Sequence, residues 1–253
     1  ESHIIAKLKE RLEIFRNSVQ FGLEDTAPTP SGMSGGQADQ LEKTAPRFLG
    51  ALAHKAMTYA VAVSEANAKM YRVVACPTAG SCGILPGCFV ALEEVLTLPE
   101  ENLVEGVLAA SGIGNVVTNQ ACVAGAVGGC QAECGTATSM VAGGIVAIFG
   151  GTAKQIGEAA AFAMKNVLGL VCDPVAGLVE VPCIKRNGMH AVHSLTAAEM
   201  AMAGLTSRVP VDEVILAMYN IGKAMPESLR ETSDGGLAKT PTGLIIADRV
   251  KNL

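Results

Sequence analysis

Residues 106–132, GVLAASGIGNVVTNQACVAGAVGGCQA, contain no charged side chain, and residues 134–153, CGTATSMVAGGIVAIFGGTA, contain none either. Runs of this length either cross a membrane or form the core of a helical protein. Asn115, Asn119 and Gln120 interrupt the first run, and glycine is too frequent in it for a lipid-facing helix. The second run is similar in kind. We therefore expect buried core helices and no association with a membrane.

The composition favours tight helix packing. Of the 253 residues, 49% are hydrophobic, yet only 4% are aromatic, tryptophan is absent and there are 28 glycines. Small side chains allow helices to approach closely, and a sustained period-two alternation is hard to find. We predict an all-α fold, a compact bundle of Ala/Gly-rich helices with functional Gly-rich loops. No repeat and no linker divides the chain, so residues 1–253 are expected to form one domain.

Charge and cysteine content limit the functional classes. The net charge of −5 provides no basic patch, so nucleic acid is not an expected partner. The N-terminal stretch ESHIIAKLKERLEIFRNSV is charged and periodic, unlike a signal peptide. The eight cysteines should therefore stay reduced, and we expect a cytoplasmic protein.

Helical spacing and capping signals locate the expected helices. Thr97 with Glu100 and Thr152 with Gln155 both resemble capping boxes, and Gly169 should end the second of these helices. The predicted helices cover residues 5–19, 46–71, a short segment from 86, 97–111, 152–169, 187–205 and 210–222.

Five loop segments combine glycine with a hydroxyl, thiol or amide side chain. One glycine at a turn is commonly only a position of positive φ, but five such segments on a helical body indicate a site. In residues 31–36 the backbone N–H groups could cradle a carboxylate or phosphate, or the segment could be a flexible linker. The segments are SGMSGG (31–36), PTAGSCG (77–83), GGCQAECG (128–135), CDPVAG (172–177) and RETSDGG (230–236).

Cys130, Cys172 and Cys183 lie in Gly- and Pro-rich phrases where we expect no helix to run. Thiols displayed on turns suggest ligands, whereas packing cysteines favour the apolar face of a helix. Their spacing fits neither a zinc ribbon nor a ferredoxin run, so a cluster assembled from distant loops remains open. Three thiolates would leave one iron of a cubane free for chemistry.

The other five cysteines are assigned separately. Cys82 is a weaker candidate for the site, and Cys76, Cys88 and Cys122 have ordinary core interpretations. Cys134 follows Cys130 by four residues. We interpret it as a packing residue, because a fourth thiolate would close the cluster.

Four phrases together resemble the α chain, or catalytic domain, of the iron-sulfur L-serine dehydratases. They are PTAGSCGILPG (77–87), GGCQAECG, CDPVAGLVEVPCIKRN (172–187) and RETSDGGLA (230–238), and the similarity covers nearly the whole chain. The resemblance implies a [4Fe-4S] cluster held by Cys130, Cys172 and Cys183. It also implies conversion of L-serine to pyruvate and ammonia, within amino-acid degradation and gluconeogenesis. Because some relatives carry their β domain as a separate chain, we expect a heteromer with a β subunit.

The expected substrate contacts lie in the same loops. The substrate carboxylate needs N–H donors or a cation, and Asn67 and Asn187 could add hydrogen bonds. No general base is evident, and it could belong to another chain. The candidates for holding the carboxylate are Ser31, Gly35, Gly36, Thr78 and Ser81, with Arg186 as a charge partner.

Other functions stay open at this point. One is an iron-sulfur dehydratase of a different small hydroxy acid, because a single methyl group is worth only about 1 to 3 kcal/mol in a pocket. Another is a helical membrane or scaffold protein. His190 and His193 share a helix face, but no third histidine accompanies them, so a histidine metal site is a weak alternative. Lys185 lies in no motif typical of pyridoxal phosphate enzymes, so a pyridoxal site is a weak alternative too.

Overall fold

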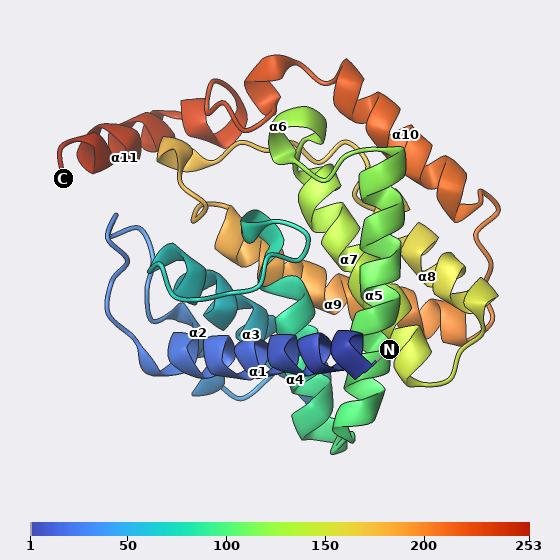
Figure 1. Cartoon of the computed structure of the whole chain (residues 1–253). Helices are drawn as coiled ribbons and strands as arrows, with labels where there is room; N and C mark the ends of the chain where they lie inside the picture. Colours follow the sequence, from blue (N-terminus) through green and yellow to red (C-terminus); the bar gives the residue numbers. More distant parts are fainter. Residues whose placement is uncertain (1) are drawn as a thin grey trace.

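A computed structural model describes residues 2–253 of the chain, and Figure 1 shows the arrangement of its elements. Over these residues there is no β-strand, only an isolated bridge between Cys172 and Arg230, so the all-α prediction is confirmed. The α-helices are α1 (Ser2–Glu24), α2 (Gln37–Glu42), α3 (Ala51–Ala68), α4 (Ile84–Leu96), α5 (Glu100–Gln120), α6 (Gly125–Gly128), α7 (Thr136–Ile148), α8 (Ala153–Lys165), α9 (Cys183–Met202), α10 (Val211–Ala224) and α11 (Pro241–Lys251).

Helix α7 forms the centre of the protein. Every residue of this helix is buried, and α4, α5, α8 and α9 pack around it. A Cβ at Gly144 would lie 2.8 Å from the backbone oxygen of Gly106, so α5 and α7 approach each other at a pair of glycines. The charge-free run 134–153 is therefore largely a core helix.

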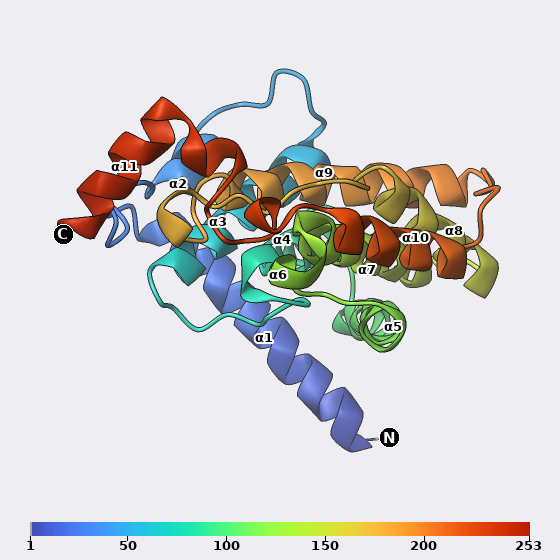
Figure 2. The same cartoon turned by 90° about the horizontal axis from the view of Figure 1, so that it is seen from above.

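Helix α3 organises a second layer, and contacts α1, α4 and α9. Helix α1 lies across this layer, and its N-terminal end projects away from the body in Figure 2. The Arg16 guanidinium joins α1 to α4 and α5, 2.7 Å from Glu93 and 3.2 Å from Glu100. Helix α11 stands apart at the C-terminal end, packed against the short helices η3 (Val175–Gly177) and η5 (Gly236–Lys239).

One capping prediction is confirmed and one is wrong. Thr152 and Gln155 form a reciprocal capping box at the start of α8. Thr97 instead ends α4 in the left-handed conformation, with φ 53°, and Pro99 occupies the N-cap position of α5. A short α4–α5 connection needs the left-handed turn at Thr97, so this residue is not available to cap α5.

Several helix boundaries differ from the predictions. Helix α5 continues to Gln120 rather than stopping near residue 111, because Gly106 and Gly114 pack against neighbouring helices instead of forming a turn. Helix α3 begins at Ala51, α4 at Ile84 and α9 at Cys183. Helix α8 ends at Lys165, before Gly169, and α2 and α11 were not predicted.

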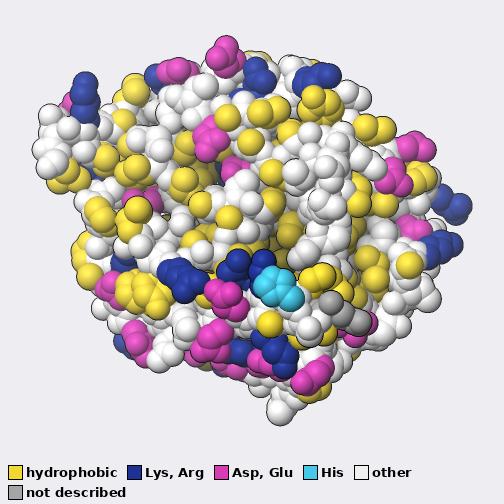
Figure 3. All heavy atoms as spheres, in the orientation of Figure 1, with side chains coloured by type: hydrophobic (Ala, Val, Ile, Leu, Met, Phe, Trp, Pro, Cys, Tyr) yellow, Lys and Arg dark blue, Asp and Glu magenta, His cyan; other side chains and the backbone are white. Residues whose placement is uncertain are grey.

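The surface and one apolar segment bear on the membrane question. The 18-residue window Ala79–Leu96 is long and apolar enough to cross a membrane by composition, and 67% of it is buried inside the protein, as in a core helix. On the face drawn in Figure 3, acidic and basic side chains are interspersed, with hydrophobic side chains scattered between them.

Candidate active site

The three predicted ligand thiols are all buried, with exposed fractions of 2% for Cys130, 3% for Cys172 and 7% for Cys183. The expectation that helices avoid these positions is wrong for two of them. Cys130 immediately precedes a π-helix (η2, Gln131–Gly135), and Cys183 is the first residue of α9. Pro182 accounts for the second case, because proline is well suited to the start of a helix.

Cys172 lies in extended backbone that pairs with the loop RETSDGG. Its N–H donates to the carbonyl of Leu229 at 2.9 Å, and its carbonyl accepts from the N–H of Glu231 at 2.7 Å. Two loops that are far apart in sequence therefore meet at this thiol, which is buried rather than displayed as predicted.

A buried carboxylate lies beside the thiols. Glu133, 7% exposed, is on the π-helix, and its Oε2 lies 3.7 Å from the Cys172 Sγ. Its Oε1 accepts a hydrogen bond of 2.7 Å from the Thr78 hydroxyl. The loop 77–83, the π-helix and the Cys172 segment thus meet at Glu133.

Two glycines pack closely at this point. A Cβ at Gly125 would lie 2.7 Å from Glu133 Oε2 and 3.0 Å from Cys172 Sγ, and a Cβ at Gly80 would lie 3.0 Å from Glu133 Oε1, so neither position has room for a side chain. Cysteine thiolates are ligands of metals and metal clusters. The buried thiols with Glu133 form a donor set that fits such a group.

The charged states of these groups are coupled. Hydrogen bonds from the Cys134 and Cys172 thiols hold the pKa of Cys130 well below its ordinary range. Burial raises the pKa of Cys183 to about 12, with Cys130 adding to the shift. Burial also raises the pKa of Glu133 to about 7. A thiolate therefore forms most readily at Cys130, which suits a metal ligand.

Arg186 connects the two loops around Cys172. Its guanidinium donates to the Val171 carbonyl and to Asp173 Oδ1, both at 3.0 Å. The other oxygen of Asp173, a side chain that is 3% exposed, accepts from the N–H of Leu237 at 2.8 Å. Arg186 is thus paired with a buried carboxylate beside the ligand segment.

Asn187 holds the loop 77–83 from α9. Its Oδ1 accepts from the Gly83 N–H at 2.9 Å, and its Nδ2 donates to the carbonyls of Gly80 and Cys183 at 2.8 and 2.9 Å. Asn67 makes a longer contact to the same loop, 3.5 Å from the Ala79 carbonyl. The Asn187 amide therefore positions this loop through one acceptor and one donor, while its other N–H bonds within α9.

Ser81 is also engaged within the loop. It is fully buried, donates to the Cys76 carbonyl at 3.1 Å and lies 3.2 Å from the Thr78 hydroxyl. The Ser81 hydroxyl thus lies beside Thr78, the residue that donates to Glu133.

The loop 31–36 binds carboxylates of this chain. Thr29 and Ser31 each donate to Glu180 at 2.7 Å, and Ser34 also donates to it. Glu180 is 4% exposed and lies three residues before Cys183. The loop is therefore joined directly to the segment that carries a predicted ligand.

The glycine end of the same loop surrounds a second carboxylate. Glu65 on α3 is fully buried and accepts from the N–H groups of Gly35, Gln37 and Ala38 at 3.1, 3.1 and 3.2 Å. Gly36 has φ 72° and serves as the N-cap of α2. Of the segment 31–36, the Gly35 N–H binds a carboxylate together with two N–H groups of α2, and that carboxylate is Glu65.

Sequence reasoning missed Glu133, Glu65, Glu180 and Glu231. Glu133 carried a usable signal, because it is the sole charged residue between positions 106 and 153. The ligand atoms of Glu133, Cys172 and Glu231 lie within 4.8 Å of one another, so these three could hold a metal ion. A glutamate in an exposed loop, such as Glu231, has no comparable signal in the sequence.

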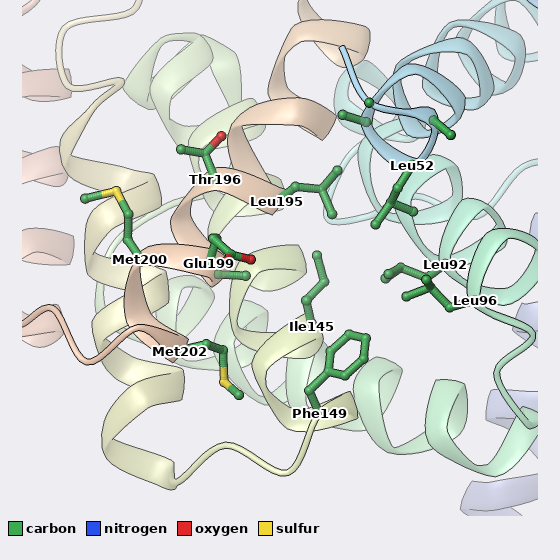
Figure 4. A pocket seen from close by; sticks show the side chains of 14 residues that line it. Leu52, Leu92, Leu96, Ile145, Phe149, Leu195, Thr196, Glu199, Met200 and Met202 are labelled. Carbon is green, nitrogen blue, oxygen red and sulfur yellow. The ribbon is translucent and has the colours of Figure 1, made fainter.

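Two cavities have linings that do not include Glu133. One, of about 860 Å³, is lined mainly by apolar side chains, including Leu92, Ile145 and Leu195, and no cysteine lines it (Figure 4). The other, of about 610 Å³, includes Arg186, His190 and His193 in its lining. The two histidine rings are 5.9 Å apart.

Comparison with known proteins covers most of the chain. The family described as "Serine dehydratase alpha chain" matches residues 1–238. A probable L-serine dehydratase alpha chain from Bacillus subtilis (strain 168) is 49% identical over 95% of this chain and 81% of its own length. The L-serine dehydratase alpha chain of Peptoniphilus asaccharolyticus is 43% identical over 96% and 84%. An L-serine dehydratase of Escherichia coli (strain K12) is 46% identical over 71% of this chain, but only 40% of its own length is matched.

Proposed function

This chain belongs to the serine dehydratase alpha-chain family, and on that premise we propose that it is the catalytic subunit of an L-serine dehydratase, forming pyruvate and ammonia. The observation that carries the proposal is the meeting of three family-like loops at Glu133. This carboxylate accepts a hydrogen bond from Thr78 in one loop and contacts the Cys172 thiol in another. Cys130 immediately precedes the π-helix that carries Glu133.

We propose Cys130, Cys172 and Cys183 as the ligands of a [4Fe-4S] cluster. Bound there, the group supplies a Lewis acid that weakens the bond to the leaving hydroxyl of the substrate. The buried thiols and the close approach of the Gly125 backbone to Cys172 support this assignment. Cys134 is not needed as a ligand.

The residues of this chain position and polarise the substrate. We propose that Ser31, Gly35, Gly36, Asn67, Thr78, Ser81, Arg186 and Asn187 form the substrate site, either by contact or by holding the loops that make contact. Asn187 acts in the second way, because its amide binds the loop 77–83. Asp173, the ion-pair partner of Arg186, holds the loop 235–239 through the Leu237 N–H. The Cys172 thiol donates to Glu133 Oε2 and the Thr78 hydroxyl donates to Oε1, so both oxygens of this carboxylate hold neighbouring loops in place.

The finer context of the enzyme is also a proposal. We place the reaction in the cytoplasm, where thiols stay reduced, and treat the chain as one catalytic domain that works with a separate β subunit. The printed name "alpha chain" of the Bacillus and Peptoniphilus relatives supports the second chain. The group that removes the α-proton of serine could then come from the β subunit.

The test is pyruvate formation by the complex of this chain with its β subunit, purified and loaded with iron and sulfide without oxygen. We expect dehydration of L-serine, with a lower kcat/KM for L-threonine. Exposure to oxygen should abolish the activity, and ferrous iron with a reductant should restore it. Full activity after all iron has been chelated would overturn the cluster assignment, and a higher kcat/KM for another hydroxy acid would overturn the substrate.

A further inference from the structure

Cys130 and Cys134 lie side by side at the π-helix. Their Sγ atoms are 3.4 Å apart, and both side chains are buried, with exposed fractions of 2% and 1%. Residues four apart on a helix are neighbours on its surface. Cys130 and Cys134 are four apart at the π-helix, so their thiols lie on one face of a single helical turn.

The pair needs little movement to become a disulfide. A disulfide has an S–S distance of about 2.05 Å, so the two sulfur atoms must approach by about 1.4 Å. Both belong to one short segment, so the approach requires only changes in side-chain torsions and a local adjustment of the π-helix. Cysteines on separate elements would require two elements to move.

Cys172 is the competing partner for Cys130. Its backbone is held on both sides, by the Leu229 carbonyl and the Glu231 N–H, and its thiol is directed to Glu133 at 3.7 Å. The Cys172 thiol also hydrogen-bonds to Cys130, but closing this contact to a covalent bond would pull the thiol away from Glu133 and strain a backbone that is fixed on both sides. Cys134 has no such restraint on its thiol apart from Cys130 itself.

We propose that the Cys130–Cys134 pair is an oxidation site, which closes to an intramolecular disulfide when a two-electron oxidant reaches the chain without its cluster. The two thiols lose two protons and two electrons, the S–S bond forms, and the oxidant takes up both. With an azodicarboxamide such as diamide, the product is the corresponding hydrazine. The consequence for iron uptake rests on the proposed function, because it requires Cys130 to be a ligand.

A disulfide at Cys130 removes a ligand. The oxidised chain should therefore fail to take up iron until a dithiol reductant reopens the bond. Oxidative loss of the cluster would then be reversible, because the disulfide protects Cys130 from further oxidation to sulfinic acid.

The experiment uses the full chain without cluster, treated with diamide in the folded state, then denatured and alkylated. Cleavage after glutamate separates residues 106–133 from residues 134–158, because Glu133 lies between the two cysteines. We expect a mass loss of about 2 Da, two hydrogen atoms, and one linked pair of these peptides. Cys122→Ala, which removes the other thiol of peptide 106–133, should leave the link intact, and Cys134→Ala should abolish it.

A second measurement separates this proposal from the ligand assignment. Iron uptake by the oxidised wild-type chain should fall at least tenfold without a dithiol reductant and recover with one, whereas Cys134→Ala should load normally after the same treatment. An unchanged mass, or a link from Cys130 to Cys172, would overturn the proposal. If the link forms while iron uptake is unaffected, the disulfide stands and Cys130 is not a ligand.

Discussion

The Thr78 hydroxyl donates a 2.7 Å hydrogen bond to Glu133, a residue 55 positions later in the chain. This contact joins the loop 77–83 to the π-helix that follows Cys130, and the other oxygen of Glu133 faces Cys172. The loops that carry the family motifs are thus connected through one buried carboxylate rather than through their glycines.

Thr78→Val should reduce kcat/KM for L-serine about tenfold and destabilise the chain by about 1 to 3 kcal/mol, because Glu133 loses a buried donor. Thr58→Val is the matched control. The Thr58 hydroxyl is buried without a hydrogen-bond partner, so its removal should be neutral or slightly stabilising. Steady-state kinetics and urea unfolding measure both effects. Equal behaviour of the two variants would contradict the role of the Thr78 contact.

Cys172→Ser should remove most of the iron and abolish dehydration while the helical fold persists. The serine can keep the backbone bonds to Leu229 and Glu231, which do not involve the thiol. Iron analysis after anaerobic loading and far-ultraviolet circular dichroism check the two halves of the prediction. Full iron occupancy in this variant would rule out Cys172 as a ligand.

Gly125→Ala should lower iron uptake, because the added methyl would lie 2.7 Å from Glu133 Oε2 and 3.0 Å from the Cys172 thiol. Gly112→Ala on α5 is the control, since no atom lies within 4 Å of a Cβ there. It should load normally and gain about 0.5 to 1 kcal/mol of stability from the better helix former. Iron content and thermal unfolding distinguish the two, and normal loading of Gly125→Ala would argue against a cluster at this position.

Glu180→Gln should loosen the loop 29–36, because an amide has one acceptor oxygen where the carboxylate has two for three hydroxyl donors. We expect a loss of about 1 to 3 kcal/mol and faster amide hydrogen exchange in residues 32–36. Glu24→Gln, at an exposed position, serves as the control. Unchanged exchange in the loop would show that Glu180 does not hold it.

His190 should make stability depend on pH. Burial lowers its pKa from 6.5 to about 4, with His193 and Arg186 adding to the decrease and Cys130 opposing it. The unfolded chain therefore binds this proton at a higher pH than the folded chain. The contribution of neutral His190 to the free energy of unfolding is present above pH 6.5. It is lost as the pH falls toward 4, by roughly 3 kcal/mol in total.

Urea unfolding of the cluster-free chain between pH 4 and 7 tests this dependence. His190→Gln should flatten the pH profile, whereas His3→Gln, at an exposed position on α1, should leave it unchanged. A profile for His190→Gln that is as steep as that of the wild type would mean that His190 titrates normally in the folded chain.

The sequence by itself determined the all-α class, because the absence of period-two alternation and the abundance of small residues are local properties that need no knowledge of the neighbours. The capping box of Thr152 and Gln155 is of the same kind, since it joins residues three positions apart. The family phrases likewise named loops that the structure brings together at Glu133. Local signals were unreliable at Thr97, where a neighbouring helix end competes for the same residue.

Only the tertiary structure decided what these loops bind. The hydrogen bonds of Glu65 to the loop 35–38, of Glu180 to Ser31 and of Glu133 to Thr78 join residues far apart in the sequence. A buried carboxylate must find hydrogen-bond donors, but the chain contains many hydroxyl and N–H groups that could serve. Which donors it meets depends on how the helices pack, and local pattern carries no information about that choice.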